Sequence, residues 1–224
     1  MKIQKRLILF LTFIFSVIAL ISLNIVKAIN SNNTILIYLD PGHGGFDGGA
    51  TSTDKLTVEK EINLITCLYL KSYLEKTGIK VKLTRSEDKA LSSSKKEDIY
   101  TRVKNINRSN CDLYISIHVN SYPNNNIKGS QTFYNEENDY NKMLATNIME
   151  SLRMIDITNK RVAKSIKGKY LLDHTKKTGC LVELGFLSNE IDLNNLKQDK
   201  YIQKISFQIY LGILDYLKES RIYE

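Results

Sequence analysis

The sequence predicts a single-domain α/β fold: a layered sandwich with a largely parallel sheet. Short apolar segments rich in Ile, Leu and Val alternate along the chain with longer segments of helical periodicity. Two of the apolar segments, residues 34–40 and 113–118, end in polar or glycine-rich sequence. Of the 224 residues 42% are apolar, which suffices for one domain with an ordinary core.

Each expected element follows from its local pattern. Residues 34–40 are rich in strand formers and end at Pro41-Gly42, which predicts a buried strand that leads into a loop. The spacing of Ile62, Ile65 and Tyr69 predicts a helix over residues 59–76 with these side chains on its buried face. The remaining elements are expected as a strand at 79–84, a loop at 86–96, a helix at 97–107, a strand at 113–118, a loop at 122–128, a strand at 129–134, a helix at 140–154, a strand at 180–184, a short helix from 188 or 189 to 196, and a helix at 201–218.

Residues 1–28 have the organisation of an export signal. A basic start is followed by an almost wholly apolar run from Leu7 to Leu23, and Val26-Lys27-Ala28 resembles a cleavage site. The run is near the lower limit of about 17 residues for a membrane-spanning helix, so an uncleaved N-terminal anchor is the alternative. Both interpretations place the rest of the chain outside the membrane. We therefore expect an exported protein with a leader at 1–28, a linker at 29–34, a folded domain at 35–218 and a tail at 219–224.

Charge and cysteine content exclude two classes of function. The formal net charge is +8, but residues 1–28 hold four basic and no acidic residues, and the rest contains no basic run typical of nucleic-acid binding. Cys67, Cys111 and Cys180 form no Cys-x-x-Cys pair, which argues against a cysteine-based zinc site. Each lies among apolar residues, so we expect three small buried side chains and no disulfide framework.

Three polar residues near the ends of predicted strands are candidates for a site. His43 lies in the sequence Asp40-Pro-Gly-His-Gly-Gly, His118 ends the strand at 113–118, and Glu183 lies in the apolar segment 180–184. Ligands of open α/β sheets bind at the carboxyl ends of strands, so these side chains are expected to share one cleft. A carboxylate buried without a partner is costly, which favours a functional Glu183. Each histidine taken alone is also compatible with a structural role, which is the commoner one for a single histidine at a strand end such as His118. Asp40 is expected to hold the His43 ring.

A carboxylate at the start of the helix at 59–76 would complete a metal site. Glu59 and Glu61 compete for this role, and helical phase does not decide between them. Two histidines and one carboxylate, with a coordination position left open, are typical of catalytic zinc. The helical His-Glu-x-x-His motif of many metalloproteases is absent from the sequence.

Five segments in this order resemble the amidase-3 family of zinc N-acetylmuramoyl-L-alanine amidases. They are Asp40-Pro-Gly-His-Gly-Gly-Phe-Asp47, Glu59-Lys-Glu-Ile-Asn-Leu64, Thr84-Arg85, Ser116-Ile-His-Val-Asn-Ser121 and Val182-Glu-Leu-Gly-Phe-Leu-Ser-Asn189. The resemblance implies one Zn²⁺ bound by His43, Glu59 and His118, with Glu183 as the catalytic base. It also implies a central mixed six-stranded sheet in a three-layer sandwich. Thr178-Gly179 stands where the family usually has a proline, so the resemblance does not predict the shape of the loop at this point.

The implied substrate is peptidoglycan, cut between the lactyl group of muramic acid and the L-alanine of the stem peptide. The chain looks most similar to the sporulation-specific branch, which trims spore-cortex peptidoglycan on the way to muramic lactam and so affects germination. Asn120, Arg85 and Arg102 are candidate substrate contacts, with surface or ion-pair roles as alternatives for the two arginines.

An accessory activator protein is a candidate partner, and membrane contact is expected only through the leader. The rival functions are a zinc peptidase that cuts stem peptides and a non-catalytic wall-binding protein on the same scaffold.

Overall fold

The structure is a computed structural model, and it describes residues 34–220. Six strands form one sheet in the order β2-β1-β3-β6-β4-β5. The strands are β1 (Leu36–Pro41), β2 (Lys80–Leu83), β3 (Leu113–Asn120), β4 (Gln131–Tyr134), β5 (Lys164–Ser165) and β6 (Thr178–Phe186). The helices are α2 (Glu59–Lys76), α3 (Lys95–Arg108), α4 (Asp139–Arg153), α5 (Tyr170–His174), α6 (Glu190–Leu196) and α7 (Asp199–Glu219).

The sheet is mixed and mostly parallel, as predicted. Strands β2, β1, β3 and β6 run parallel to one another, β4 is antiparallel to β6, and β5 is parallel to β4. The register places Asp40 of β1 opposite Ser116 of β3, and His118 of β3 opposite Glu183 of β6. Because β1, β3 and β6 are parallel, their carboxyl ends meet at one edge of the sheet.

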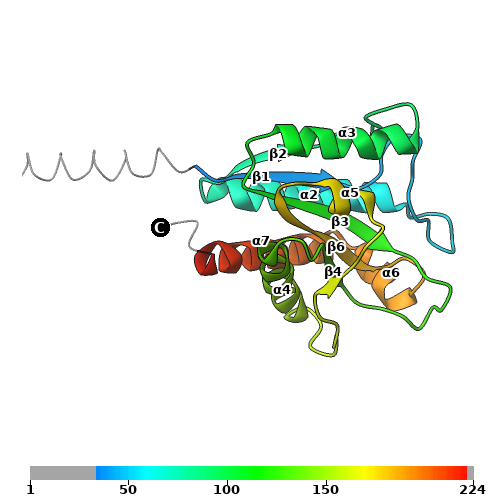
Figure 1. Ribbon diagram of the computed structural model, residues 1–224. Helices are drawn as coiled ribbons and strands as arrows, with labels where there is room; N and C mark the ends of the chain where they lie inside the picture. Colours follow the sequence, from blue (N-terminus) through cyan, green and yellow to red (C-terminus); the bar gives the residue numbers. More distant parts are fainter. Residues whose placement is uncertain (1–33, 221–224) are drawn as a thin grey trace, which may run out of the picture. The chain divides into compact units, whose positions relative to one another are not determined.

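Helices cover both faces of the sheet, which confirms the predicted three layers. Ile37 and Leu39 of β1 pack into a core that contains side chains of α2, α4 and α7. Tyr38, between them on the strand, packs into a second core with side chains of α3 and α5. This alternation follows from the two-residue period of a strand. In Figure 1, α3 lies on one side of the sheet and α4 and α7 lie on the other.

The predicted elements recur with small shifts, and two short ones were missed. Strand β5 has two residues and α5 has five, so neither is long enough to produce a readable period. Helix α3 begins earlier than expected because the Ser94 side chain caps it by accepting a hydrogen bond from the Glu97 backbone. Asn189 caps α6 in the same way through Asp192.

Thr178-Gly179 opens β6 without disturbing the strand. The Gly179 N–H donates a hydrogen bond of 2.8 Å to Asn141 Oδ1, a contact that proline could not make. A side chain at Gly179 would meet the Tyr114 ring at 2.1 Å, so glycine allows Tyr114 to pack across β6. Glycine thus gives β6 a regular start where the resemblance would lead one to expect a proline.

Cys67, Cys111 and Cys180 are buried and unpaired, as predicted. The leader at 1–28 and most of the linker lie outside the described residues, and so does the end of the tail. Within residues 34–220, no helix has both the length and the hydropathy that crossing a membrane requires.

Candidate metal centre and active site

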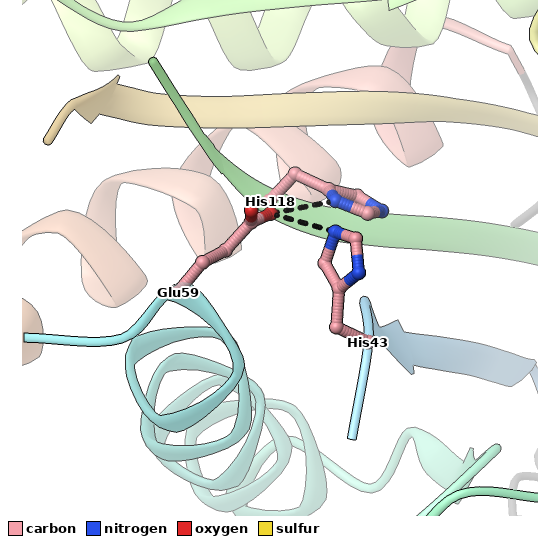
Figure 2. Close-up of side chains that lie close together, drawn as sticks. All are labelled: His43, Glu59 and His118. Carbon is pink, nitrogen blue, oxygen red and sulfur yellow. Dashed lines mark hydrogen bonds and ion pairs between the residues drawn. The ribbon is translucent and has the colours of Figure 1, made fainter. Parts of the chain in front are cut away.

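Three side chains converge at the carboxyl edge of the sheet. His43 lies in the loop after β1, Glu59 is the first residue of α2, and His118 lies in β3. One candidate ligand atom from each residue lies within 4.8 Å of the others. Figure 2 shows both imidazole rings next to the Glu59 carboxylate. Glu59 Oε1 is 2.9 Å from His118 Nδ1 and 3.3 Å from His43 Nε2. Two imidazoles and one carboxylate form a donor set that suits a divalent transition metal.

The burial of α2 separates Glu59 from Glu61. The buried face of this helix contains Glu59, Ile62 and Thr66, at helical spacing, whereas Glu61 is exposed. Ile65, which we expected to be buried, is 43% exposed. That error made the two glutamates look equivalent, because Ile65 marks the face of Glu61.

Glu59 is 4% exposed and its carboxylate is well satisfied. Oε2 accepts a hydrogen bond of 2.7 Å from the Ala50 N–H, and Oε1 accepts one of 3.1 Å from the Val119 N–H. Burial alone would raise the pKa of Glu59, but hydrogen bonds and charges from His118 and His43 outweigh burial and lower it. Glu59 is therefore held as an anion, the form that binds a cation.

The loop after β1 turns sharply at His43, which has a left-handed backbone with φ of 62°. Two glycines make room for the ligands beside it. A Cβ at Gly42 would lie 2.2 Å from the His118 ring, and one at Gly49 would lie 2.5 Å from Glu59 Oε2. Glycine at these positions lets the loop approach the other two ligands closely.

The carboxylate that holds the His43 ring is Asp47, and our expectation of Asp40 was wrong. His43 Nδ1 lies 2.7 Å from Asp47 Oδ2, and Lys95 Nζ lies 2.7 Å from the other oxygen. Burial would lower the pKa of His43, but Glu59 and Asp47 together raise it. Asp47 ends the same sequence motif as His43, and its spacing of four residues is the signal that sequence reasoning overlooked.

Asp40 is fully buried, and its hydrogen bonds go to residues other than His43. Its oxygens accept hydrogen bonds from Thr84 Oγ1 at 2.6 Å and from Ser116 Oγ at 2.7 Å, and Arg102 Nη1 lies at 2.7 Å. Like Tyr38 two residues before it in β1, Asp40 lies on the face of the sheet that α3 covers, where it pairs with Arg102. Burial would raise its pKa, but the charge of Arg102 and the two hydroxyl hydrogen bonds lower it.

Glu183 lies on β6 directly opposite His118 and is 7% exposed. Its Oε2 atom is buried and has no hydrogen-bond partner among the described residues. Burial raises the pKa of Glu183 to about 7, against the opposing charge of His118. A cavity of about 420 Å³ is lined by Glu183 together with His43, Glu59, His118 and Asn120. The four residues expected to bind metal and act as base thus share one cleft.

The structure buries the two arginines that were candidates for substrate contacts or for surface and ion-pair roles. Arg85 and Arg102 are each 2% exposed and lie beneath the loop that carries His43. Their guanidinium groups bond to backbone carbonyls and, for Arg102, to Asp40 and Asp98. The ion-pair alternative is therefore the one observed for Arg102. Asn120 lines the cleft and stays a predicted substrate contact.

Comparison with known proteins places the chain in one enzyme family. Residues 37–215 match the family of N-acetylmuramoyl-L-alanine amidases, and the chain belongs to it. The germination-specific N-acetylmuramoyl-L-alanine amidase of Bacillus subtilis is 41% identical over 193 residues, which cover 83% of this chain and 81% of that protein. The CwlD amidase of Clostridioides difficile, solved in complex with the GerS lipoprotein, is 37% identical with a TM-score of 0.80, covering 83% of this chain and 99% of that one.

An N-acetylmuramoyl-L-alanine amidase of Clostridium difficile 630 is a more distant relative. It is 28% identical with a TM-score of 0.76, and the match covers 83% of this chain and 98% of that one. The predicted fold and enzyme class are confirmed: the chain has the amidase fold, and it is an amidase that acts on peptidoglycan.

Proposed function

We propose that the protein uses Zn²⁺, held by His43, Glu59 and His118, to hydrolyse the amide bond between N-acetylmuramic acid and L-alanine. The observation that carries this proposal is the position of Glu183 next to His118 in the cleft that the three ligands line, with an oxygen that has no partner among the described residues. A buried carboxylate atom without a partner fits a group that meets its partner only when substrate or water enters.

The donor set supports zinc in particular. Two imidazoles and one carboxylate leave a coordination position free, as catalytic zinc sites require. When bound, Zn²⁺ polarises a carbonyl group and makes a nearby water molecule easier to deprotonate. Asp47 supports the same interpretation, because a carboxylate that accepts a hydrogen bond from the second ring nitrogen of a histidine orients it as a metal ligand.

Glu183 performs the proton transfers in the proposed reaction. Its carboxylate takes a proton from the water that attacks the scissile carbonyl carbon, and it returns a proton to the nitrogen of the departing L-alanine. The carbon–nitrogen bond breaks, which leaves a carboxylate on the lactyl group and a free amine on the stem peptide. A pKa of about 7 suits both transfers near neutral pH.

Product analysis of digested peptidoglycan tests the reaction. We expect glycan strands whose muramic acid carries a free lactyl carboxyl group, together with intact stem peptides. Fragments of the stem peptide would instead identify a zinc peptidase. Retention of the protein on the polymer without any soluble product would identify a wall-binding protein. Asn120 is proposed as a substrate contact, and Asn120→Ala is expected to raise KM more than it lowers kcat.

We further propose that the protein is exported through residues 1–28 and acts on spore-cortex peptidoglycan. The 41% identity to a germination-specific amidase supports this role. The relative solved with the GerS lipoprotein supports an accessory protein as partner. Spores from a strain without the gene are expected to lack muramic lactam and to germinate poorly. Normal cortex composition in such spores would argue for a different wall substrate.

A further inference from the structure

Two buried arginines hold the backbone of the loop that carries His43. Arg85 follows β2 and Arg102 lies in α3, yet both donate a hydrogen bond of 2.6 Å to the His43 carbonyl oxygen. His43 has the left-handed backbone that residues other than glycine rarely adopt, with φ of 62°. Such a strained conformation persists only where surrounding contacts hold it in place. Here two charged guanidinium groups donate to the same carbonyl oxygen and so fix the backbone at His43.

Arg85 also reaches the segment that carries Glu59. Besides the His43 carbonyl, its guanidinium donates to the backbone carbonyl oxygens of Pro41 at 3.1 Å, Gly42 at 3.0 Å, Lys60 at 2.8 Å and Glu87 at 3.2 Å. Lys60 is the residue after Glu59, in the first turn of α2. One guanidinium group therefore bonds to the backbone of two metal-ligand segments.

The Asn63 side chain adds a second link between the same two segments. Its Nδ2 atom donates to the Gly42 carbonyl oxygen at 3.1 Å and to Glu59 Oε1 at 3.3 Å. The relative position of His43 and Glu59 is thus fixed by contacts beneath the cleft.

Arg102 acts on the loop alone. It donates to the Pro41 and His43 carbonyl oxygens at 2.7 and 2.6 Å, while Asp40 and Asp98 hold its guanidinium at 2.7 and 2.5 Å. Within residues 34–220, none of its hydrogen bonds reaches α2.

We propose that Arg85 is a positioning residue that sets the spacing between His43 and Glu59 for metal binding, and that Arg102 supports it by fixing the loop. This inference rests on the proposed metal-binding function. The planar guanidinium is essential, because a lysine ammonium is a compact charge that cannot span carbonyls in two segments. Arg85 therefore contributes to metal affinity without touching the metal or the substrate.

The test measures Zn²⁺ affinity in the full-length protein by competition with a chromophoric chelator. Arg85→Lys is expected to raise the Kd for Zn²⁺ by roughly tenfold to a hundredfold, as for other residues that orient ligands. Its far-UV circular dichroism is expected to match that of the wild type. The absorption spectrum of bound Co²⁺ is expected to change as well, because the spacing of the ligands changes. Arg102→Lys is expected to have a smaller effect of the same sign.

Two control variants separate positioning from general stability. Arg161→Lys is the matched substitution, because Arg161 also donates to a backbone carbonyl, that of Lys128, outside the cleft. Leu217→Ala removes a buried side chain of α7 and lowers stability without touching the loop. Both are expected to bind Zn²⁺ with the affinity of the wild type.

A folded Arg85→Lys protein with the wild-type Kd and Co²⁺ spectrum would overturn the proposal. If Arg85→Lys does not fold, Arg102→Lys decides: weaker Zn²⁺ binding supports the proposal, and unchanged binding overturns it. Wild-type protein that fails to bind Zn²⁺ would contradict the proposed function itself, which is a distinct outcome.

Discussion

Glu59 and Glu183 are two carboxylates buried to a similar degree in one cleft, with opposite electrostatic surroundings. Glu59 begins α2 and accepts hydrogen bonds from backbone N–H groups, and both histidines lie beside it. Glu183 lies in the middle of an apolar strand, and one of its oxygens has no partner among the described residues. Burial raises the pKa of both groups, but only at Glu59 do the neighbours reverse the effect.

The comparison shows that neighbours rather than burial assign the two roles. A carboxylate held as an anion by two histidines and two N–H groups is suited to bind a cation. A carboxylate whose pKa lies near 7 is suited to take up and release a proton. The predictions below test this division, from the largest expected effect to the smallest.

Removing the Glu59 charge is expected to have the largest effect. Glu59→Gln should abolish stoichiometric zinc binding and activity, because the amide cannot supply an anionic ligand. Glu61→Gln, the same change two residues away on the exposed face of α2, should keep both. Metal analysis after dialysis checks the pair. Zinc retained by Glu59→Gln and lost by Glu61→Gln would reverse our assignment.

Removing the Glu183 proton acceptor is expected to act on catalysis and not on metal content. Glu183→Gln should lower kcat by roughly 10²–10⁴-fold, the usual contribution of general acid–base catalysis. Zinc should remain stoichiometric. Glu190→Gln, an exposed glutamate at the start of α6, is the matched control. Full activity in Glu183→Gln would exclude Glu183 as the base.

The raised pKa of Glu183 also predicts how stability depends on pH in the metal-free protein. Between its ordinary value of 4.5 and about 7, the folded state binds the proton more tightly than the unfolded state. The free energy of unfolding from this group therefore falls as pH rises through that window, by roughly 3 kcal/mol in total. Glutamine does not titrate, so the Glu183→Gln variant does not undergo this loss. Its free energy of unfolding relative to that of the wild type should therefore rise by this amount across the same pH window.

Urea unfolding at pH 4.5 and above pH 7 in the presence of a chelator measures this difference. The stability gap between Glu183→Gln and wild type should widen toward higher pH and then level off. A constant gap for Glu183→Gln would show that burial does not raise the pKa of Glu183.

The smallest expected effect concerns the partner of the His43 ring. Asp47→Asn should raise the Kd for Zn²⁺ by roughly tenfold, the lower end for groups that orient a histidine ligand. Asp47 also pairs with exposed Lys95, so Lys95→Met separates the two contacts. Isothermal titration of both variants is the measurement. An equal loss of affinity in Lys95→Met would assign the effect to the ion pair and not to the ring contact.

Sequence reasoning identified the strong periodic elements and both histidines, but it judged side-chain direction less well. The bounds of α2 were predicted correctly, yet Ile65 was placed on the wrong face, so Glu59 and Glu61 looked equivalent. Helical spacing is shared by several faces, and only packing against the sheet selects one of them. Asp40 and Asp47 were confused for a similar reason, since both flank His43 in the sequence.

The sequence by itself determined the fold class, the order of the main elements and the chemistry available at the strand ends. These features depend on local patterns: apolar runs, helical period, and polar residues where strands stop. Tertiary structure alone decided which groups meet. The sequence left Arg85 and Arg102 open between substrate contact and a surface or ion-pair role, whereas folding buries them beneath the His43 loop, where they bond to its carbonyls. The parallel register of β3 and β6 likewise places Glu183 opposite His118. The sequence could not predict this pairing, because the pairing of distant strands has no local signature.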